Sequence, residues 1–385
     1  MRILYIDQTA ELGGAELSLF AEVTNLPHQA SVLLFQDGRL REMFQAAGIA
    51  VEVLASAAAA RDVKKGSGLV AVLAAAPAVL RLVFAVAARA KKHDLIYANS
   101  QKAFVVGALA AALTGKRLVW RLRDVLDEMH FSAALIKIVV RLANWKANCV
   151  IANSEATKRA FGQAGGDLSR AFVAYPGIDE RPFAVVTDEQ VAAMRAELGA
   201  GDAKLVGVFG RLSAWKGQDV FVEALARVPG AVGVIVGSAL FGEEAFEAAL
   251  REKILALGMQ DRIRLLGFRE DIPVLMRAMD VVVHCSVAAE PFGRVVVEGM
   301  MAGKPVVASR AGGVMEILED RVTGFLVAPG CVGGISASIE SALVGGKVAE
   351  AGHKLAREQF TVAATIRQIQ AALSALTDAH PNSSA

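Results

Sequence analysis

The chain has 385 residues, of which 54% are hydrophobic, and its 41 basic and 39 acidic side chains leave a net charge of +2. This length suffices for two domains of ordinary size, and the near-neutral balance gives no electrostatic case for a nucleic-acid partner. The three cysteines and six histidines are scattered without metal-ligand spacing, so we expect buried thiols in a reducing compartment and no structural metal.

Apolar runs and helical patterns alternate along the first 178 residues. The apolar run at the N-terminus is only as long as a strand, so we expect no signal peptide and a cytoplasmic protein. Gly13 and Gly14 stand between the first strand and a helix, where they would let a ligand approach the backbone, although a plain turn explains them equally well. The alternation predicts an α/β fold with a parallel, doubly wound sheet. The predicted strands are Arg2 to Asp7, Ala30 to Phe35, Val51 to Leu54, Leu95 to Ala98, Leu118 to Arg121, Val150 to Ala152 and Ala171 to Ala174.

The segment from Gly68 to Lys92 is unusually apolar. Its longest uncharged run, Gly68 to Leu80, is shorter than the ~20 residues that a membrane span requires. Two interpretations stay open: a helix buried on the sheet, or an interfacial helix that docks on an anionic membrane beside a lipid-linked acceptor. In the second case residues 133–146 would add to the contact, and the protein would be peripheral on the cytoplasmic face of the inner membrane. The basic residues that support it are Arg61, Lys64, Lys65, Lys91, Lys92, Lys137, Arg141 and Lys146.

Asp179 to Thr187 follows a Pro-Gly turn and is predicted to be a linker, after which strands and helices alternate again. Gly210 and Arg211 end the first strand of this half, and Lys216 precedes the next helix. Open α/β sheets bind ligands at the carboxyl ends of their strands, where two cations suit a diphosphate. A pair of solvated surface cations is the alternative. The predicted strands are Leu205 to Phe209, Val232 to Val236, Ile263 to Leu266, Val281 to Val283, Val306 to Ser309 and Phe325 to Val327.

The stretch from Val281 to Glu319 holds two glutamates around a predicted helix start. Glu290 precedes Pro291 and is therefore disfavoured in helical geometry, whereas Glu298 lies inside a helix expected from about Phe292 to Ala302. Free amides at the start of that helix would suit a phosphate; they belong to Phe292, Gly293 and Arg294. Two acids that flank an anion site suggest a nucleotide sugar. The alternative is a helix with one solvated and one capping glutamate.

The sequences EPFGRVVVE (290–298), GRLSAWKG (210–217) and GGVMEI (312–317) resemble the donor-site signature of retaining GT-B glycosyltransferases, the family that includes sucrose synthase and bacterial mannosyltransferases. The resemblance implies two Rossmann-like domains whose parallel sheets face a central cleft, and a C-terminal helix that crosses back to the first domain. The implied boundaries are 1–178 for the acceptor-side domain, 179–187 for the linker, 188–361 for the nucleotide-sugar domain, 362–379 for the returning helix and 380–385 for a tail.

The same resemblance implies roles for the site residues. Arg211 and Lys216 would hold the diphosphate and stabilise the leaving group, Glu290 would bind hydroxyls of the transferred sugar, and Glu298 would bind the ribose. Arg211, Lys216 and Glu290 are the expected catalytic residues. The full set expected to contact the donor is Gly13, Gly14, Gly210, Arg211, Lys216, Phe268, Glu290, Phe292, Gly293, Arg294 and Glu298.

The implied reaction moves a hexose or N-acetylhexosamine from a nucleotide-diphosphate sugar to a hydroxyl of a glycan or lipid-linked acceptor, with retention of configuration. We expect a role in cell-envelope glycan, polysaccharide or glycolipid synthesis. No Asp-x-Asp motif occurs, so we expect no metal and no cofactor. At Arg121, many relatives carry a histidine that faces the donor sugar, and arginine stays protonated and cannot act as a base.

Three other interpretations compete with this one. A nucleotide-sugar epimerase of the same fold would isomerise the donor without an acceptor. A non-catalytic sugar- or membrane-binding subunit would not need the intact pairs of cations and acids. A glycosidase also uses paired carboxylates, but it does not need an arginine and a lysine for a diphosphate.

Overall fold

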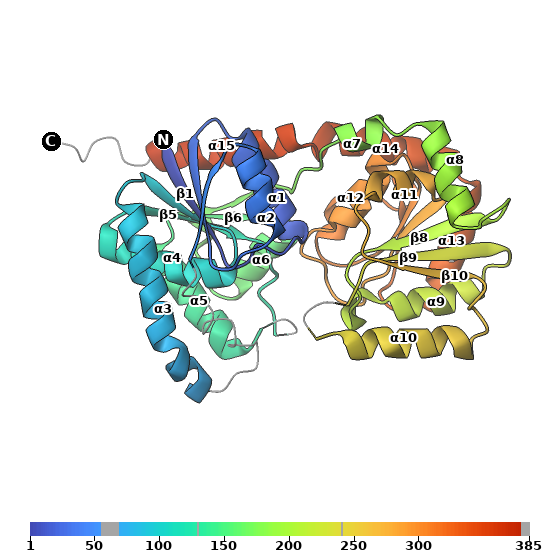
Figure 1. Cartoon of the computed structure of the whole chain (residues 1–385), viewed down its shortest axis with the longest axis horizontal. Coiled ribbons are helices and arrows are strands. Elements are labelled where there is room, and N and C mark those ends of the chain that lie inside the picture. Colours follow the sequence, from blue (N-terminus) through green and yellow to red (C-terminus); the bar gives the residue numbers. More distant parts are fainter. Residues whose placement is uncertain (55–68, 129–130, 240–241, 379–385) are drawn as a thin grey trace. The chain divides into compact units, whose positions relative to one another are not determined.

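The computed structural model describes residues 1–54, 69–128, 131–239 and 242–378. The chain divides into two compact units (Figure 1), of which the first comprises Met1–Gly177 with Val362–Ala385 and the second comprises Ile178–Thr361. Each unit is built on its own parallel sheet with helices on both faces. The predicted α/β class with two Rossmann-like domains is confirmed. The predicted tail at 380–385 lies outside the described residues.

The first unit contains a seven-stranded parallel sheet in the order β3-β2-β1-β4-β5-β6-β7. Successive residues of β1 face opposite sides, so that Leu4 and Ile6 join one core and Ile3 and Tyr5 the other. Burial on both faces explains why the strands appear as continuous apolar runs. The strands are β1 (Arg2–Asp7), β2 (Gln29–Leu34), β3 (Ala50–Val53), β4 (Leu95–Ala98), β5 (Arg117–Leu122), β6 (Cys149–Ala152) and β7 (Ala171–Val173).

Two groups of helices cover this sheet (Figure 1). One face carries α3 (Leu69–Ala90), α4 (Gln101–Thr114) and α5 (Ala133–Lys146), and the other carries α1 (Gly14–Asn25), α2 (Arg39–Ala46) and α15 (Val362–Asp378). Helix α6 (Glu155–Gln163), whose Phe161 joins the core on the side of α3, α4 and α5, begins after the N-cap Ser154, whose hydroxyl accepts a hydrogen bond from the Thr157 amide at 3.0 Å.

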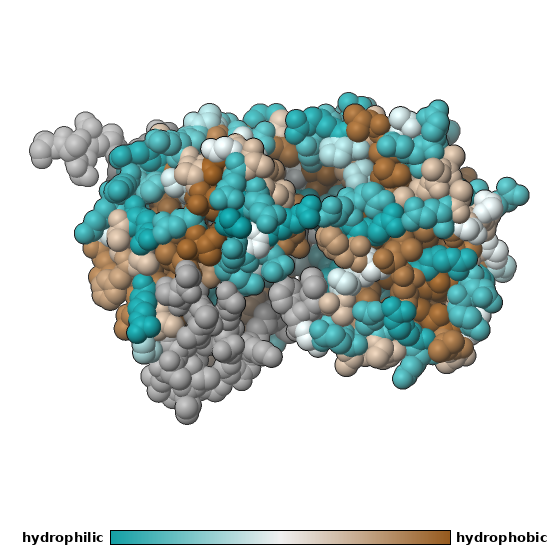
Figure 2. Space-filling view, in the orientation of Figure 1, coloured by the Kyte–Doolittle hydropathy of each residue, from teal (hydrophilic) through white to brown (hydrophobic). Residues whose placement is uncertain are grey.

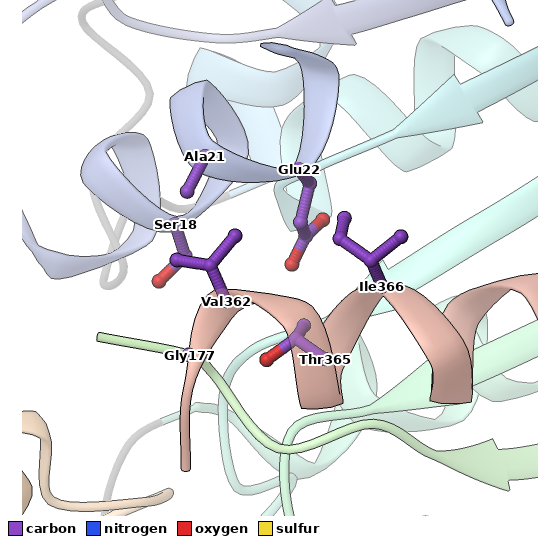
Figure 3. A pocket seen from close by; sticks show the side chains of 7 residues that line it. All are labelled: Ser18, Ala21, Glu22, Gly177, Val362, Thr365 and Ile366. Carbon is purple, nitrogen blue, oxygen red and sulfur yellow. The ribbon is translucent and has the colours of Figure 1, made fainter. Parts of the chain in front are cut away.

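The C-terminal helix returns to the first unit because its apolar stripe completes a core there. Ile366, Ile369 and Leu373 are buried beside residues of α1 and α2, at the spacing of one helical face. The Thr365 hydroxyl donates to the Tyr175 carbonyl at 2.6 Å. A crevice between α1 and the start of α15 (Figure 3) leaves no room for a water-sized molecule, so this junction is closely packed.

Most of the apolar segment at 68–92 forms α3, which continues through Pro77. Leu82, Val83 and Val86 are buried against the sheet, as the interpretation of a helix covering the sheet requires. Gly68 and the basic positions 61, 64 and 65 lie outside the described residues. In the described parts of the chain, no helix combines the length and apolar character needed to cross a membrane.

The second unit contains a six-stranded parallel sheet in the order β10-β9-β8-β11-β12-β13. Its strands are β8 (Lys204–Phe209), β9 (Ala231–Val236), β10 (Ile263–Gly267), β11 (Val281–His284), β12 (Val306–Ser309) and β13 (Phe325–Val327). Its helices are α7 (Arg181–Ala184), α8 (Asp188–Glu197), α9 (Gln218–Ala226), α10 (Glu244–Ala256), α11 (Ile272–Ala278), α12 (Arg294–Met301), α13 (Val332–Val344) and α14 (Gly346–Gln359).

Residues 179–187, predicted to be a linker, are part of the second unit. They contain α7, and the buried side chain of Phe183 anchors them beside α11, where the Arg277 guanidinium donates to the Phe183 carbonyl at 3.5 Å. Val186 is buried as well, so two apolar side chains hold a segment that was predicted only from its Pro-Gly turn.

Hydrophobic side chains also reach the surface of the second unit, notably over α10 (Figure 2), where Leu255 and Leu257 are exposed. A groove of about 530 Å³ separates α9 from α10. The Lys253 ammonium in its wall is paired with Asp219 and Glu223. Arg227 and Glu252 also line the groove, so its wall carries charges of both signs.

Candidate active site

The predicted site residues of the second unit follow the carboxyl ends of parallel strands. Arg211 follows β8, Glu290 follows β11, and the glycine pair at 312–313 follows β12. Because these strands run in the same direction, their following loops leave the sheet at one edge. This is the edge where open α/β sheets bind ligands.

Glycines allow these loops to come close together. Gly217 has a φ of +71°, and a Cβ atom there would stand 2.2 Å from the Cys285 carbonyl oxygen. Gly312 has a φ of +61°, and a Cβ atom there would stand 2.2 Å from the Glu290 carbonyl oxygen. That same oxygen accepts a hydrogen bond from the Gly313 amide at 2.8 Å. The glycine pair is therefore needed to bring this loop against Glu290, because a side chain at Gly312 would clash with the Glu290 backbone.

Lys216 and Glu290 form the centre of the site. The Lys216 ammonium donates to both carboxylate oxygens of Glu290, at 2.8 and 2.9 Å, and the two side chains are only 20% and 13% exposed. The ammonium also lies 4.2 Å from the centroid of the Trp215 ring, which adds a cation–π contact. Two residues assigned from different motifs are thus brought into direct contact.

The carboxylate of Glu290 has two further donors. The Ser286 hydroxyl donates to Oε2 at 3.0 Å, and His284 Nε2 lies 3.2 Å from the same oxygen. Burial alone would raise the pKa of Glu290, but Lys216 and the hydrogen bond from His284 outweigh it and hold the pKa well below its usual range. Glu290 is therefore ionised at any physiological pH.

His284 and Ser286 were not among the predicted site residues. The strand predicted from the sequence ends at Val283, whereas in the structure His284 is the last residue of β11. Its Nε2 also lies 3.1 Å from the Ser286 hydroxyl. Residues two apart in extended chain share a side. The sequence signal that could have identified them is a histidine and a serine two positions apart, at the end of a buried strand and just before Glu290.

The helix after Glu290 begins later than predicted. It starts at Arg294 with Gly293 as its N-cap, so Pro291 lies outside the first turn and the first helical amide is that of Arg294. The cause is Gly293, whose φ is +111° and where a Cβ atom would stand 2.9 Å from Val314 Cγ2. Within the helix, Arg294 donates to Glu298 at 3.1 Å. Glu290 and Glu298 thus have different cationic partners.

The other predicted residues of this unit lie around the same edge. Gln218 Nε2 donates to the Arg211 carbonyl at 2.9 Å, and the Gly210 amide donates to the Val236 carbonyl at 2.9 Å, so the backbone of the Gly210–Arg211 turn is fixed. Phe268 follows β10 and is 62% exposed, which leaves its ring available to a planar ligand group.

Gly13 and Gly14 belong to the first unit, where Gly13 is the N-cap of α1. The Glu16 carboxylate folds back over Gly13. A Cβ atom at Gly13 would stand only 2.7 Å from Glu16 Oε2. Burial, together with the neighbouring Asp7, raises the pKa of Glu16 to about 7. The glycine therefore makes room for a carboxyl group at the start of α1.

Arg121 does not have the exposed, donor-facing place that the resemblance implies for this end of the strand. The side chain is fully buried, and its guanidinium donates to Glu22 at 3.0 Å and to the Ala174 carbonyl at 2.8 Å. Its place in β5 directs it to the face covered by α1 and α15, whereas its neighbour Trp120 packs on the opposite face. Arg123 donates to the same oxygen of Glu22 at 3.1 Å.

Comparison with known proteins identifies two matching family models. "Glycosyl transferases group 1" matches residues 191–359, and "Glycosyl transferase 4-like domain" matches residues 17–177. The crystal structure of HepE from Anabaena in complex with UDP-glucose is 40% identical, with a TM-score of 0.88, over 97% of this chain and 100% of that chain. Sucrose-phosphate synthase from Thermosynechococcus elongatus, at 19% identity and a TM-score of 0.80, shares the fold.

Curated relatives match over shorter stretches. A D-inositol 3-phosphate glycosyltransferase from Mycobacteroides abscessus is 35% identical over 42% of this chain and 36% of its own length. The lipopolysaccharide core biosynthesis glycosyltransferase LpsE from Rhizobium meliloti is 33% identical over 46% of this chain and 51% of its own length. The matched part thus spans between a third and about half of these two relatives.

Proposed function

Because the chain belongs to the group 1 glycosyltransferase family and has the GT-B type of fold, we propose that it transfers a hexose or N-acetylhexosamine from a nucleotide-diphosphate sugar to a hydroxyl of a glycan or lipid-linked acceptor. We further propose retention of configuration and a role in cell-envelope glycan synthesis at the cytoplasmic face of a membrane. The relatives named for lipopolysaccharide core and inositol-phosphate glycosylation support this assignment.

The observation that carries the proposal is the contact between Lys216 and Glu290, at 2.8 and 2.9 Å. A cation and an ionised carboxylate held side by side match the two parts of a sugar diphosphate. The ammonium attracts the negatively charged diphosphate, and the carboxylate accepts hydrogen bonds from neutral sugar hydroxyls. A glycosidase or a lectin would need the carboxylate but not the cation.

The chemistry assigned to these residues is electrostatic. As the bond between the anomeric carbon and the diphosphate oxygen breaks, negative charge grows on the leaving group, where Lys216 and Arg211 would stabilise it. Glu290 would hold the sugar while the acceptor oxygen attacks from the same face, and the diphosphate oxygen would take the proton of the acceptor. Glu298, held by Arg294, would bind the ribose.

We propose that the protein cations replace a metal ion in this step, so that no cofactor is needed. The support is the pair of Arg211 and Lys216 beside the expected diphosphate position and the lack of an Asp-x-Asp motif in the sequence. For the donor, UDP-glucose is the first compound to test, because HepE was crystallised with it.

A donor screen followed by product analysis tests the proposal. Melting temperature would be measured with UDP-, GDP- and ADP-sugars, because a donor that binds only the folded chain raises it. The best donor would then be incubated with and without saccharide acceptors. Free nucleoside diphosphate formed in proportion to transferred sugar supports a transferase. An isomerised nucleotide sugar without acceptor would identify an epimerase instead, and donor binding without any turnover would identify a binding subunit.

A further inference from the structure

Three of the helices on one face of the first sheet, α3, α4 and α5, contain no acidic residue. Asp and Glu are absent from the sequences of α3, α4 and α5, which carry Arg81, Arg89, Lys102, Lys137, Arg141 and Lys146. Arg89 is paired with Glu52 on β3. Within the described residues, Arg81, Lys137 and Arg141 form no ion pair, and all three are exposed. Within the described residues of these three helices, Arg81, Lys137 and Arg141 therefore present positive charge that no acidic side chain of the same helices offsets.

Large hydrophobic side chains stand among these cations. On α3, Leu80 is 52% and Phe84 is 63% exposed, and on α5, Ile138 is 59% and Trp145 is 62% exposed. Single exposed hydrophobic residues are common on protein surfaces and need no explanation. Here, however, four of them alternate with cations on only two helices.

The exposed residues lie on the sides of α3 and α5 that do not pack on the sheet. Leu82, Val83 and Val86 of α3, like Val139 and Val140 of α5, are buried in the core against the sheet. Both helices pack against α4 and cover the same side of the sheet (Figure 1). Their outward residues therefore form one surface of the unit. We call it the α3/α5 face; its members are Leu80, Arg81, Phe84, Lys137, Ile138, Arg141 and Trp145.

We propose that the α3/α5 face is a docking surface for an anionic lipid membrane. Aliphatic and aromatic side chains partition into the interfacial region, tryptophan especially, while lysine and arginine remain at the level of the headgroups and attract anionic lipids. The uncompensated cations identify the partner as negatively charged, and the aliphatic side chains identify it as apolar below its surface. The inference depends on this surface alone and not on the identity of the donor.

Two other partners fit the same residues less well. A nucleic acid would contact cations and aromatic rings but would leave Leu80 and Ile138 without a role, and the chain as a whole carries a charge of only +2. A second copy that docked through the same face would oppose Arg81, Lys137 and Arg141 with like charges. Both partners are outcomes that the experiment can detect.

The test is flotation of the full chain with vesicles of phosphatidylcholine alone or with phosphatidylglycerol. We expect binding to the anionic vesicles that weakens with added salt. The double variant Lys137→Glu/Arg141→Glu should bind at least about 25-fold more weakly, since each cation near the surface contributes roughly fivefold. The matched control Lys347→Glu/Lys354→Glu changes the same charge on α14 of the other unit and should bind like the original chain.

Fluorescence gives an independent readout of insertion. Of the three tryptophans, Trp120 is fully buried and Trp145 is mostly exposed. A blue shift on addition of anionic vesicles, lost in Trp145→Phe, supports insertion of this face. Equal binding by the two charge-reversed variants, no binding to anionic vesicles, or tighter binding to an oligonucleotide than to vesicles would overturn the proposal. A dimer disrupted by the α5 variant would identify a self-association surface instead. None of these readouts uses sugar transfer, so they are independent of the proposed activity.

Discussion

The Lys216 ammonium contacts both carboxylate oxygens of Glu290, at 2.8 and 2.9 Å. In this arrangement the ammonium and the carboxylate neutralise each other's charge. A ligand that offers only an anion would draw Lys216 away and leave Glu290 with Ser286 and His284 as its remaining donors. A nucleotide sugar offers an anion for the lysine and hydroxyl groups for the glutamate. If the chain binds a nucleotide sugar as proposed, the pair should favour the complete donor over either of its parts.

Removing the charge of Lys216 should slow the reaction more than it weakens the fold. Lys216→Gln keeps a hydrogen-bond donor for Glu290 but loses the charge that is proposed to stabilise the leaving diphosphate. We expect kcat to fall by about 10²- to 10³-fold, the range seen when one stabilising group of a transition state is removed. Steady-state kinetics with the donor identified in the screen provides the measurement, with circular dichroism to check the fold.

A matched control is Lys204→Gln. Its ammonium lies 3.6 Å from Asp280 at the opposite end of β8 and is 57% exposed. This variant should keep normal turnover. If Lys216→Gln is as active as Lys204→Gln, Lys216 does not hold the diphosphate.

Sugar transfer should not require a divalent metal. The proposal places two protein cations, Arg211 and Lys216, where other enzymes use a metal ion against the diphosphate. Activity is expected to remain unchanged after dialysis against excess EDTA and to gain nothing from added Mg²⁺ or Mn²⁺. Loss of transfer in EDTA that either metal restores would contradict the assignment.

The sheets could be predicted from the sequence because their strands are buried on both faces. Such strands are short apolar runs, and the runs found at Arg2 to Asp7 and Leu205 to Phe209 correspond to β1 and β8. The start of α12 could not be predicted, because it depends on a positive φ at Gly293 and on the nearby Val314. Such long-range packing leaves no local sequence pattern.

The contact between Lys216 and Glu290 and the buried pair of Arg121 and Glu22 show the same limit. The motifs around Lys216 and Glu290 identified both residues as candidates but did not predict their contact, since 74 positions separate them. The burial of Arg121 depends on Glu22, which is 99 positions away in sequence. The resemblance implied a donor-facing position at this strand end, and only the buried partner Glu22 explains why Arg121 points into the core instead.

Breaking the buried network of Glu22 should destabilise the first unit. Its carboxylate accepts hydrogen bonds from Arg121, Arg123 and Tyr97, and its side chain is 2% exposed. Glu22→Gln leaves two buried arginines without their counterion. We expect the free energy of unfolding to drop by about 3–5 kcal/mol, measured by urea titration. The exposed Glu42→Gln on α2 should stay within about 0.5 kcal/mol of the original chain; a similarly small change for Glu22→Gln would show that the network adds little.

Glu16 should make the folded chain less stable as the pH rises. Burial and the neighbouring Asp7 raise its pKa from 4.5 to about 7. Between these two values the unfolded chain has released the proton and the folded chain still holds it, so the free energy of unfolding falls as pH increases through this window. Glu16→Gln removes the effect. Its melting temperature relative to the original chain should therefore be higher at pH 8 than at pH 5, whereas exposed Glu11→Gln should show no such trend. A trend of opposite sign for Glu16→Gln would contradict the raised pKa.

The two glutamates of the site should differ in what they bind. Glu290 is paired with Lys216, and Glu298 with Arg294. If Glu290 contacts the transferred sugar, Glu290→Gln weakens binding of the complete donor but not of free nucleoside diphosphate. The diphosphate should even bind somewhat more tightly, because Lys216 no longer has to leave an ionised partner. Turnover should fall as well, since the sugar is no longer held while its ring approaches the transition state.

Glu298→Gln should instead weaken both ligands by a similar factor, because the ribose belongs to both. Hydrogen bonds to a charged group contribute about 1.5–3 kcal/mol, so the loss should be roughly 10- to 150-fold. Calorimetric titration with UDP-glucose and with UDP would provide all four dissociation constants. The ratio of the donor constant to the diphosphate constant should rise in Glu290→Gln and stay unchanged in Glu298→Gln. If Glu290→Gln weakens UDP as much as UDP-glucose, Glu290 does not contact the sugar, and the contact between Lys216 and Glu290 serves only to hold the loops of the site together.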